Sequence, residues 1–384
     1  MDYRTAGESH GKGILALVED FPAGLTINTD LINAELQRRQ GGYGRGDRQK
    51  IETDTVEILT GIWRGISTGA PIALWIKNRD CRIDTAPDIT QPRPGHADLA
   101  GSIKYGLPIR PILERASARE TAGRVAAGAL ARQILDRHGI TVVGFVKSIG
   151  AFTLPTEDAF PLDGLPPEEL RERRNQSELY TVFPEKDTEL KKMIDGIAEA
   201  GDSVGGIIEV RVFGVPIGLG SHVQWCDKLD GKLAQAVMSI QAIKGVEIGL
   251  GFEAARTLGS AMHDPIGFEP ARETHPCQGF VRQTNNAGGI EGGISNSQPI
   301  ILRAAMKPIP TLLKPLESIN LTTKQPMPAI YERSDVCAVP AASVVVENVV
   351  AWEIAKELVA EGNRLRLSLE NDAPLFVTPA KAGG

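Results

Sequence analysis

Two histidines, His10 and His96, lie in short segments rich in glycine, serine and arginine. His10 belongs to Gly7-Glu8-Ser9-His10-Gly11 and His96 to Arg93-Pro94-Gly95-His96-Ala97-Asp98. Neither segment has the apolar spacing of a buried helix or strand, and glycine lets a backbone approach a ligand closely. An unperturbed imidazole has a pKa of about 6.5, so it can exchange protons near neutral pH. Both histidines are therefore candidates for proton transfer.

Arginines cluster near both histidines, although the chain as a whole is acidic. A planar guanidinium binds phosphate or carboxylate through two parallel hydrogen bonds, and the two clusters together favour an anion site. Two alternatives stay open. Single arginines could pair with nearby carboxylates such as Glu35, Asp47, Glu114 and Glu120, and residues 37–50 could form an RNA-binding arm. The first cluster is Arg38, Arg39, Arg45 and Arg48, and the second, around Ser117, is Arg110, Arg115, Arg119 and Arg124.

Composition excludes several classes of protein. The 384 residues carry a formal net charge of -6, which argues against general affinity for nucleic acid. The four cysteines form no C-x-x-C pair, so we expect neither a disulfide framework nor a zinc site, and a reducing cytoplasm fits. No run of about 18 apolar residues predicts a membrane span. The sequence contains no G-x-S-x-G, Walker A or H-E-x-x-H motif, and its histidines lack metal-ligand spacing, so no metal is expected.

The elements that must position these residues occur twice along the chain. Residues 61–72 can be laid over residues 289–300 with the same residue at the Gly61, Ile62, Gly65, Ile66, Ser67, Pro71 and Ile72 columns. Upstream in each copy, an alternating strand ends in Pro-x-Gly-Leu, at 22–25 and at 216–219, and a helical pattern follows. An alanine-rich helix closes each copy, from about Arg119 to His138 and from about Ala342 to Glu361, with Gly139 and Gly362 following.

We therefore predict one domain made of two similar halves, roughly 1–145 and 205–365. A Pro/Glu-rich insertion over 152–186 separates them, followed by a short helix with Asp187 as N-cap and Gly201 at its end. Residues 370–384 read as a tail. Strands combined with long helices in each half indicate an α+β fold in which helices pack against antiparallel sheets.

Six motifs give the chain a family resemblance. Besides the two histidine segments they are Arg115-Ala116-Ser117-Ala118-Arg119-Glu120-Thr121, Lys244-Gly245-Val246-Glu247-Ile248-Gly249, Gly292-Gly293-Ile294-Ser295-Asn296 and Arg333-Ser334-Asp335. In this order they resemble chorismate synthase, from residue 3 to about 362. One departure is Ser297, where the family usually has glycine. A turn that needs a positive φ would be strained by this serine.

The resemblance implies a β-α-β sandwich, internally duplicated, and a cytoplasmic homotetramer of the shikimate pathway of aromatic amino acid biosynthesis. It implies a lyase reaction, the 1,4-elimination of phosphate from 5-enolpyruvylshikimate 3-phosphate to give chorismate, with reduced FMN (FMNH2) as cofactor. NADPH is a secondary candidate, through the positions of Arg39 and Arg45. Since no added reductase domain is evident in the sequence, we expect an external source of electrons for the flavin.

Residue roles follow from the resemblance position by position. His10 is expected to act as general acid at the departing phosphate, His96 to protonate or stabilise the anionic reduced flavin, and Asp335 to assist removal of the substrate proton. Substrate binding is expected from Ser9, Arg39, Arg45, Arg48, Arg119 and Arg124. Flavin contacts are expected from Arg115, Ala116, Ser117, Gln241, Ala242, Gly292, Lys307, Pro308, Ile309, Pro310, Thr311 and Arg333.

Two other classes of function compete with this interpretation. A phosphatase or phosphotransferase could use the same serine, histidine and arginine loops without flavin. A non-enzymatic anion-binding or RNA-binding module is the other alternative, and it predicts salt-sensitive RNA affinity without phosphate release.

Overall fold

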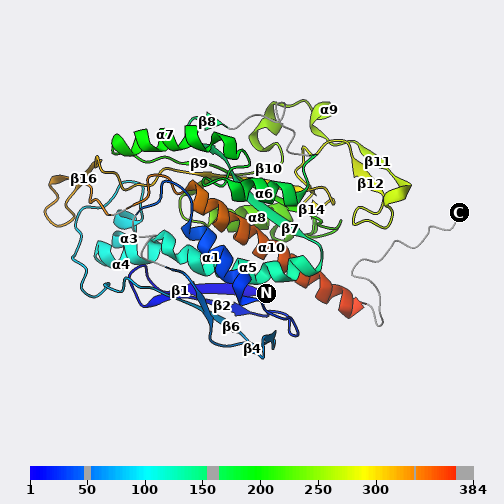
Figure 1. Cartoon of the computed structure of the whole chain (residues 1–384), viewed down its shortest axis with the longest axis horizontal. Coiled ribbons are helices and arrows are strands. Elements are labelled where there is room, and N and C mark those ends of the chain that lie inside the picture. Colours follow the sequence, from blue (N-terminus) through cyan, green and yellow to red (C-terminus); the bar gives the residue numbers. More distant parts are fainter. Residues whose placement is uncertain (47–52, 154–163, 333, 369–384) are drawn as a thin grey trace.

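A computed structural model describes residues 1–46, 53–153, 164–332 and 334–368. Two antiparallel sheets enclose a layer of helices, as the sequence predicts for an α+β fold (Figure 1). Helix α5 packs on the first sheet, α10 packs on the second, and α5 and α10 pack against each other. The helices of this layer are α1 (Thr29–Gln40), α5 (Thr121–Arg137), α8 (Leu229–Met238) and α10 (Val339–Ser368).

The two sheets share a pattern of strand pairing. The first has the order β1-β2-β6-β3, and the second has β10-β15-β9-β7-β8. Read from the opposite edge, β7-β9-β15-β10 repeats the antiparallel pairing of the first sheet. The strands are β1 (Asp2–Ala6), β2 (Gly13–Glu19), β3 (Val56–Ile58), β6 (Ile72–Lys77), β7 (Thr141–Ile149), β8 (Phe152–Thr153), β9 (Gly206–Phe213), β10 (Ile243–Ile248) and β15 (Ile300–Met306).

The recurring sequence motif forms the same small structure in each half. Hairpin β4 (Ile62–Trp63) and β5 (Ile66–Ser67) matches β13 (Ile290–Glu291) and β14 (Ile294–Ser295) in register. The Ser67 hydroxyl donates to Pro22 O at 2.7 Å, and Ser295 donates to Pro216 O at 2.6 Å. These matches support our proposal of internal duplication. They also assign β7 to the second sheet, so a boundary near 140 suits the pairing better than the expected 145.

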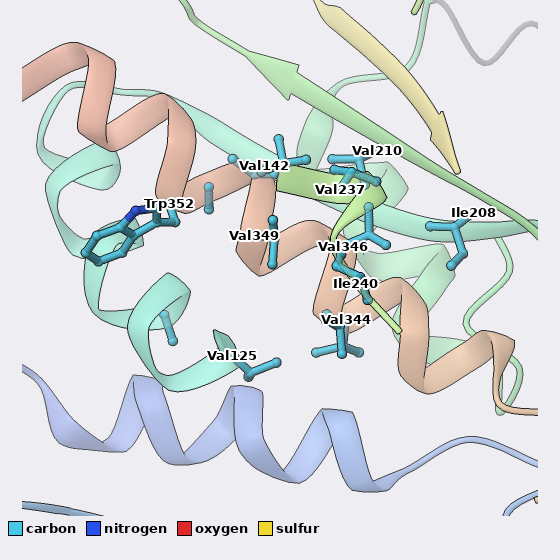
Figure 2. Close-up of a cluster of buried hydrophobic side chains, with 14 of the residues drawn as sticks. Val125, Val142, Ile208, Val210, Val237, Ile240, Val344, Val346, Val349 and Trp352 are labelled. Carbon is cyan, nitrogen blue, oxygen red and sulfur yellow. The ribbon is translucent and has the colours of Figure 1, made fainter. Parts of the chain in front are cut away.

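The core forms where α10 crosses α5 and covers the second sheet. Valines at 344, 346 and 349 of α10 are buried, and Figure 2 shows them with Val125 of α5 and Val142 and Val210 of the sheet. Gly128 allows the close crossing, because a Cβ there would lie 2.2 Å from Asn348 O. Burying each such valine contributes about 1.5 kcal/mol or more to folding. The helix layer is therefore a rigid base for the loops at its edges.

Two expected helix ends differ from the structure. Asp187 is the first residue of α7 (Asp187–Glu199) and makes no N-cap hydrogen bond; its carboxylate instead accepts from Ser177 Oγ and Glu178 N at 2.7 Å. Helix α10 begins at Val339 and continues through Gly362 to Ser368, so the glycine does not end it. A glycine weakens a helix by only about 1 kcal/mol, and the packed turns before it can carry the helix onward. Gly139, at φ +67°, does follow the end of α5.

The remaining elements surround this base. Helices α3 and α4 and the 3₁₀ turn η1 follow the His96 segment along the chain and lead into α5. They are α3 (Asp98–Tyr105), α4 (Ile109–Ala116), η1 (Ala118–Glu120), α6 (Pro167–Gln176), α9 (Gly259–Met262), β11 (Ile266–Phe268), β12 (Phe280–Arg282), β16 (Glu317–Ile319) and β17 (Pro326–Pro328).

Ser297 provides a test of the duplicated hairpins. Its φ is +71°, close to the +82° of its counterpart Gly69, and its hydroxyl is buried without a hydrogen-bond partner among the described residues. We predict that Ser297→Gly raises the free energy of unfolding by about 1 kcal/mol, because it removes left-handed strain. Gly69→Ser should lower it by a similar amount, because the serine would have to adopt the same left-handed conformation. Its new Cβ would meet Ala23 Cβ at an ordinary 3.5 Å, so no clash would add to the loss. Denaturant unfolding measures both, and a less stable Ser297→Gly protein would contradict the argument.

Candidate active site

His10 lies in the loop between β1 and β2 and is held by a glutamate of α4. Its Nδ1 is 2.9 Å from Glu114 Oε1, and its backbone N–H donates to Glu114 Oε2 at 2.8 Å. The imidazole is buried, with 7 % of the residue exposed, and the glutamate is fully enclosed. On the other side of the ring, Nε2 is 3.8 Å from Asp80 Oδ2. The geometry therefore fixes Nδ1, whereas Nε2 makes no short hydrogen bond within the described part of the chain.

Asn78, directly after β6, fixes the shape of the His10 loop. Its amide donates to the carbonyl oxygens of Glu8, Ser9 and Gly11, at 2.8 to 3.1 Å. Its oxygen accepts from Arg119 Nε at 2.8 Å. One buried side chain thus connects the histidine loop to the second arginine cluster. Ser117 adds a further link, since its hydroxyl lies 3.1 Å from that of Ser9.

Arg39 of α1 and Arg119 of η1 share one carboxylate, that of Asp54. Arg39 Nη2 donates to Asp54 at 2.7 Å, and Arg119 Nη1 donates to both oxygens at 2.6 and 2.7 Å. Burial would raise the pKa of Asp54, but the two guanidinium groups lower it overall, so the carboxylate is charged. Two positive charges and one negative charge give this buried cluster a net charge of +1. Arg39 Nε and Arg119 Nη2 are buried there without a partner in the described part of the chain.

Arg45 and Asp335 come from opposite ends of the sequence and pair at the rim of a pocket. Arg45 Nη1 is 3.0 Å from Asp335 Oδ2, and Gly46 N donates to Oδ1 at 2.7 Å. A pocket of about 500 Å³ adjoins this pair and is lined by Tyr43, Asp195 and Ser334 among others. Gln40 lines the same pocket and accepts from Asp54 N at 2.9 Å, so the pocket and the Arg39–Asp54–Arg119 cluster are neighbours.

His96 is held by the aspartate two residues after it. Its Nδ1 lies 2.5 Å from Asp98 Oδ1, and Arg93 binds the same carboxylate through Nε at 2.8 Å and Nη2 at 3.0 Å. Arg93 Nη1 also donates to Thr311 Oγ1 at 3.2 Å, and Lys307 Nζ donates to Gly95 O. Lys307 N in turn bonds Ala242 O at 3.0 Å. The structure thus joins the His96 loop to two of the expected flavin-binding segments, 241–242 and 307–311.

Arg124 and Gln241 meet at Glu120, away from Asp54. Arg124 Nε donates to Glu120 at 2.9 and 3.1 Å, and Gln241 donates to it at 3.0 Å. Arg119 and Glu120 are consecutive in η1, yet their side chains bind different groups. The carboxylate-pairing alternative therefore describes Arg124, and it also describes Arg38, which pairs with Glu35 at 2.6 Å. Arg115 bonds the backbone of Thr5 and Gly7 at 2.9 and 3.1 Å, which ties α4 to the first strand and its loop.

Three other expected site residues have no contact with the two histidine loops that the structure describes. Gly292 lies in the β13–β14 turn, and the next residue, Gly293, accepts a hydrogen bond from Leu229 N at the start of α8 at 2.9 Å. Arg48 and Arg333 lie outside the described residues. Among those that are described, no cluster of three or more possible metal-ligating side chains occurs, and no helix is long and apolar enough to span a membrane.

Five residues of the site have no role predicted from the sequence: Asp54, Asn78, Arg93, Asp98 and Glu114. Arg93 and Asp98 stand inside the His96 motif, where their charge beside the histidine is a local signal. For Glu114 the sequence indicates only a partner for arginine. Asp54 and Asn78 carry no local signal, because their partners lie 15 to 70 residues away.

Comparison with known proteins gives one consistent answer. The sequence model described as chorismate synthase matches residues 1–359. The chorismate synthase of Geobacter metallireducens is 54 % identical over 367 residues, covering 92 % of each chain, and that of Aquifex aeolicus is 52 % identical over 376 residues, covering 93 % of this chain and 92 % of the other. This chain belongs to the chorismate synthase family. The protein is therefore an enzyme, a lyase.

A solved structure supports the same assignment. A crystal structure of chorismate synthase, 45 % identical, covers 94 % of this chain and 92 % of its own, with a TM-score of 0.76. At this identity the likeness covers the sequence as well as the fold. The six motifs noted above thus occur in a chain whose chorismate synthase fold agrees with them.

The unpartnered guanidinium atoms predict where an anion binds. We expect inorganic phosphate to raise the melting temperature more than chloride at equal ionic strength, because phosphate can neutralise the Arg39–Asp54–Arg119 cluster. Arg119→Gln should weaken phosphate binding about tenfold, since a hydrogen bond to a charged group contributes about 1.5–3 kcal/mol. Arg124→Gln is the matched control and should bind phosphate as the parent does. Equal losses in both variants would contradict the placement of the site.

Proposed function

We propose that this protein eliminates phosphate from 5-enolpyruvylshikimate 3-phosphate to give chorismate, with reduced FMN. The observation that carries the proposal is the net positive charge of the Arg39–Asp54–Arg119 cluster beside the His10 loop. The substrate carries three anionic groups, a phosphate and two carboxylates, and the buried donors Arg39 Nε and Arg119 Nη2 suit one such group. Ser9 and Arg45 contribute further donors, together with Arg48. Arg124 has a weaker claim, because it is engaged by Glu120.

In this proposal His10 is the general acid of the departing phosphate. Its Nε2 carries the proton to be donated, and transfer of this proton to the leaving oxygen neutralises the charge that develops on that oxygen. The reaction breaks one C–O bond and one C–H bond. Asp335 assists removal of the substrate proton at the Arg45 end of the site, where Arg45 and Gly46 N hold its carboxylate.

The residues around Lys307 fit a flavin phosphate. Burial lowers the pKa of Lys307, and the charge of Lys244 lowers it further. No carboxylate is among the groups that shift the pKa of Lys307, so an anion beside it would relieve the repulsion from Lys244. We propose that Lys307–Thr311, Gln241 and Ala242 hold FMN, with Arg115, Ala116, Ser117, Gly292 and Arg333. When bound, reduced FMN supplies electron density to the elimination with no net redox change.

His96 belongs to this flavin region by its contacts. Its loop is fixed to Lys307 and Thr311 through Gly95 and Arg93, and its ring can hold a proton opposite the anionic reduced flavin. Asp335 and the 307–311 segment come from the second half of the chain, whereas both histidines come from the first. The site therefore needs both halves.

Reductant, oligomer and location are further parts of the proposal. We propose an external source of electrons for the flavin. NADPH bound at Arg39 and Arg45, which pair with Asp54 and Asp335, is the alternative. The four cysteines are all free, which suits a reducing cytoplasm. We propose a homotetramer from the family resemblance.

The decisive assay is anaerobic and follows both products. Purified protein, FMN, dithionite and 5-enolpyruvylshikimate 3-phosphate should release phosphate and form chorismate in equal amounts. Omitting FMN or dithionite should stop both. Phosphate release that continues without reduced flavin would overturn the proposal and favour the flavin-independent phosphatase or phosphotransferase.

The two histidines are tested by substitution with FMN saturating. We predict that His10→Ala and His96→Ala each lower kcat at least about tenfold, as is usual for general acid–base groups. His138→Ala is the control, since His138 is exposed at the end of α5. Unchanged turnover in either loop variant would refute the role of that histidine.

A further inference from the structure

Both loop histidines contact a buried carboxylate through the same ring nitrogen. His10 Nδ1 lies 2.9 and 3.0 Å from the two oxygens of Glu114, and His96 Nδ1 lies 2.5 Å from Asp98 Oδ1. The two loops share no sequence pattern, and their carboxylates are supplied differently. Glu114 is 104 residues from His10 along the chain, whereas Asp98 is two residues after His96. The same arrangement has thus been built twice.

Both carboxylates are ionised, because donors surround them. Burial would raise the pKa of Glu114, but the hydrogen bonds and charge of His10 and the charge of Arg110 lower it overall. Burial would likewise raise the pKa of Asp98, but His96 and Arg93 lower it well below its usual range. Asp98 accepts from Arg93 N, Nε and Nη2 as well as from His96, which accounts for the usual acceptor capacity of a carboxylate.

An ionised carboxylate can only accept, so each Nδ1 must carry a hydrogen. For His96 this excludes a hydrogen bond from Arg93 Nη2 to the same nitrogen, although the two atoms are 3.1 Å apart. The chemistry then falls to Nε2. Asp80 Oδ2 lies 3.8 Å from Nε2 of His10, too far for a hydrogen bond.

We propose that Glu114 and Asp98 are positioning residues that hold His10 and His96 in the Nδ1–H form, with Nε2 turned to the reactants. The inference rests on the proposed function for the identity of those reactants. Glu114 also fixes the loop itself, since it accepts from His10 N through its side chain and from Ser9 N through its backbone at 3.0 Å. Because Nδ1–H of each ring is bonded to its carboxylate, Nε2 is the nitrogen left to exchange a proton with the reactants.

Other charged groups face the two dyads and enter the pH dependence. Arg110 of α4 lies 3.7 Å from Glu114 Oε1, and its positive charge weakens the electrostatic effect of Glu114 on His10. Asp80 lies on the opposite side of the His10 ring, with Arg82 at 3.2 Å from its other oxygen. Around His96 the cations are Arg93 and, at Gly95, Lys307.

The first test is independent of turnover. In ¹⁵N-histidine-labelled protein above the pH at which the rings lose their charge, His10 and His96 should show a protonated Nδ1 and a bare Nε2, the reverse of the form favoured in free histidine. His10→Gln and His96→Gln proteins assign the signals, and the exposed His138 serves as internal reference. Protonated Nε2 in the parent protein would overturn the proposal.

The second test is the pH profile of kcat/KM. In the proposed role His10 gives up a proton, so activity should fall at high pH. Glu114→Gln removes the negative charge beside His10 Nδ1, and the basic limb of the profile should move to lower pH. Glu332→Gln is the matched control, since Glu332 pairs with the same Arg110 at 3.3 Å, and its basic limb should stay in place.

An unmoved limb in Glu114→Gln would contradict a positioning role, whatever the change in rate. Asp98→Asn should convert His96 alone to the ordinary Nε2–H form in the ¹⁵N spectrum, and retention of Nδ1–H there would likewise contradict it. Failure of the parent protein to make chorismate would defeat the proposed function and leave the spectra to decide the histidine forms on their own.

Discussion

Two guanidinium groups share one carboxylate in a part of this molecule that is almost closed to water. Arg39 is 4 % exposed, Arg119 6 % and Asp54 not at all. Burying an unbalanced charge costs several kcal/mol, so such a cluster persists only where other contributions to folding compensate for it. Each member belongs to a different segment: Arg39 to α1, Asp54 to the chain before β3, and Arg119 to η1. The rest of the structure serves to hold these three segments together.

The helix layer supplies that support. Next to Arg39, Arg38 turns the opposite way and joins a second buried network, in which Glu347 of α10 binds Arg38, Arg132 and Arg174 at 2.6 to 2.9 Å. Burial would raise the pKa of Glu347, but the three arginines lower it strongly. This network fastens α1 to α5, α6 and α10, and therefore fixes the backbone that carries Arg39. Asn78 bonds both Arg119 and the backbone of the His10 loop, so it fixes this loop relative to Arg119.

The helices and strands of this protein are easier to predict from its sequence than the partners of its charged side chains. The alternating strands, the Pro-x-Gly-Leu turns and the alanine-rich helices could be recognised because their signals are local and recur. His10 and His96 could be recognised because imidazole stands out in a glycine-rich loop. Which arginine meets which carboxylate could not, because that choice depends on elements distant in the sequence. Arg119 and Arg124 look alike in the sequence, yet one binds Asp54 and the other Glu120. The path of α10 through Gly362 likewise depends on packing that no local pattern contains.

The central claim is that the net charge of the Arg39–Asp54–Arg119 cluster holds the leaving phosphate beside His10. A crystal structure with 5-enolpyruvylshikimate 3-phosphate and FMN bound tests it most directly, through the position of the phosphorus atom. The account predicts phosphate oxygens within hydrogen-bond distance of Arg39 Nε, Arg119 Nη2 and His10 Nε2. A phosphate bound instead at Arg124, with the Asp54 cluster unchanged and distant from the substrate, would contradict it.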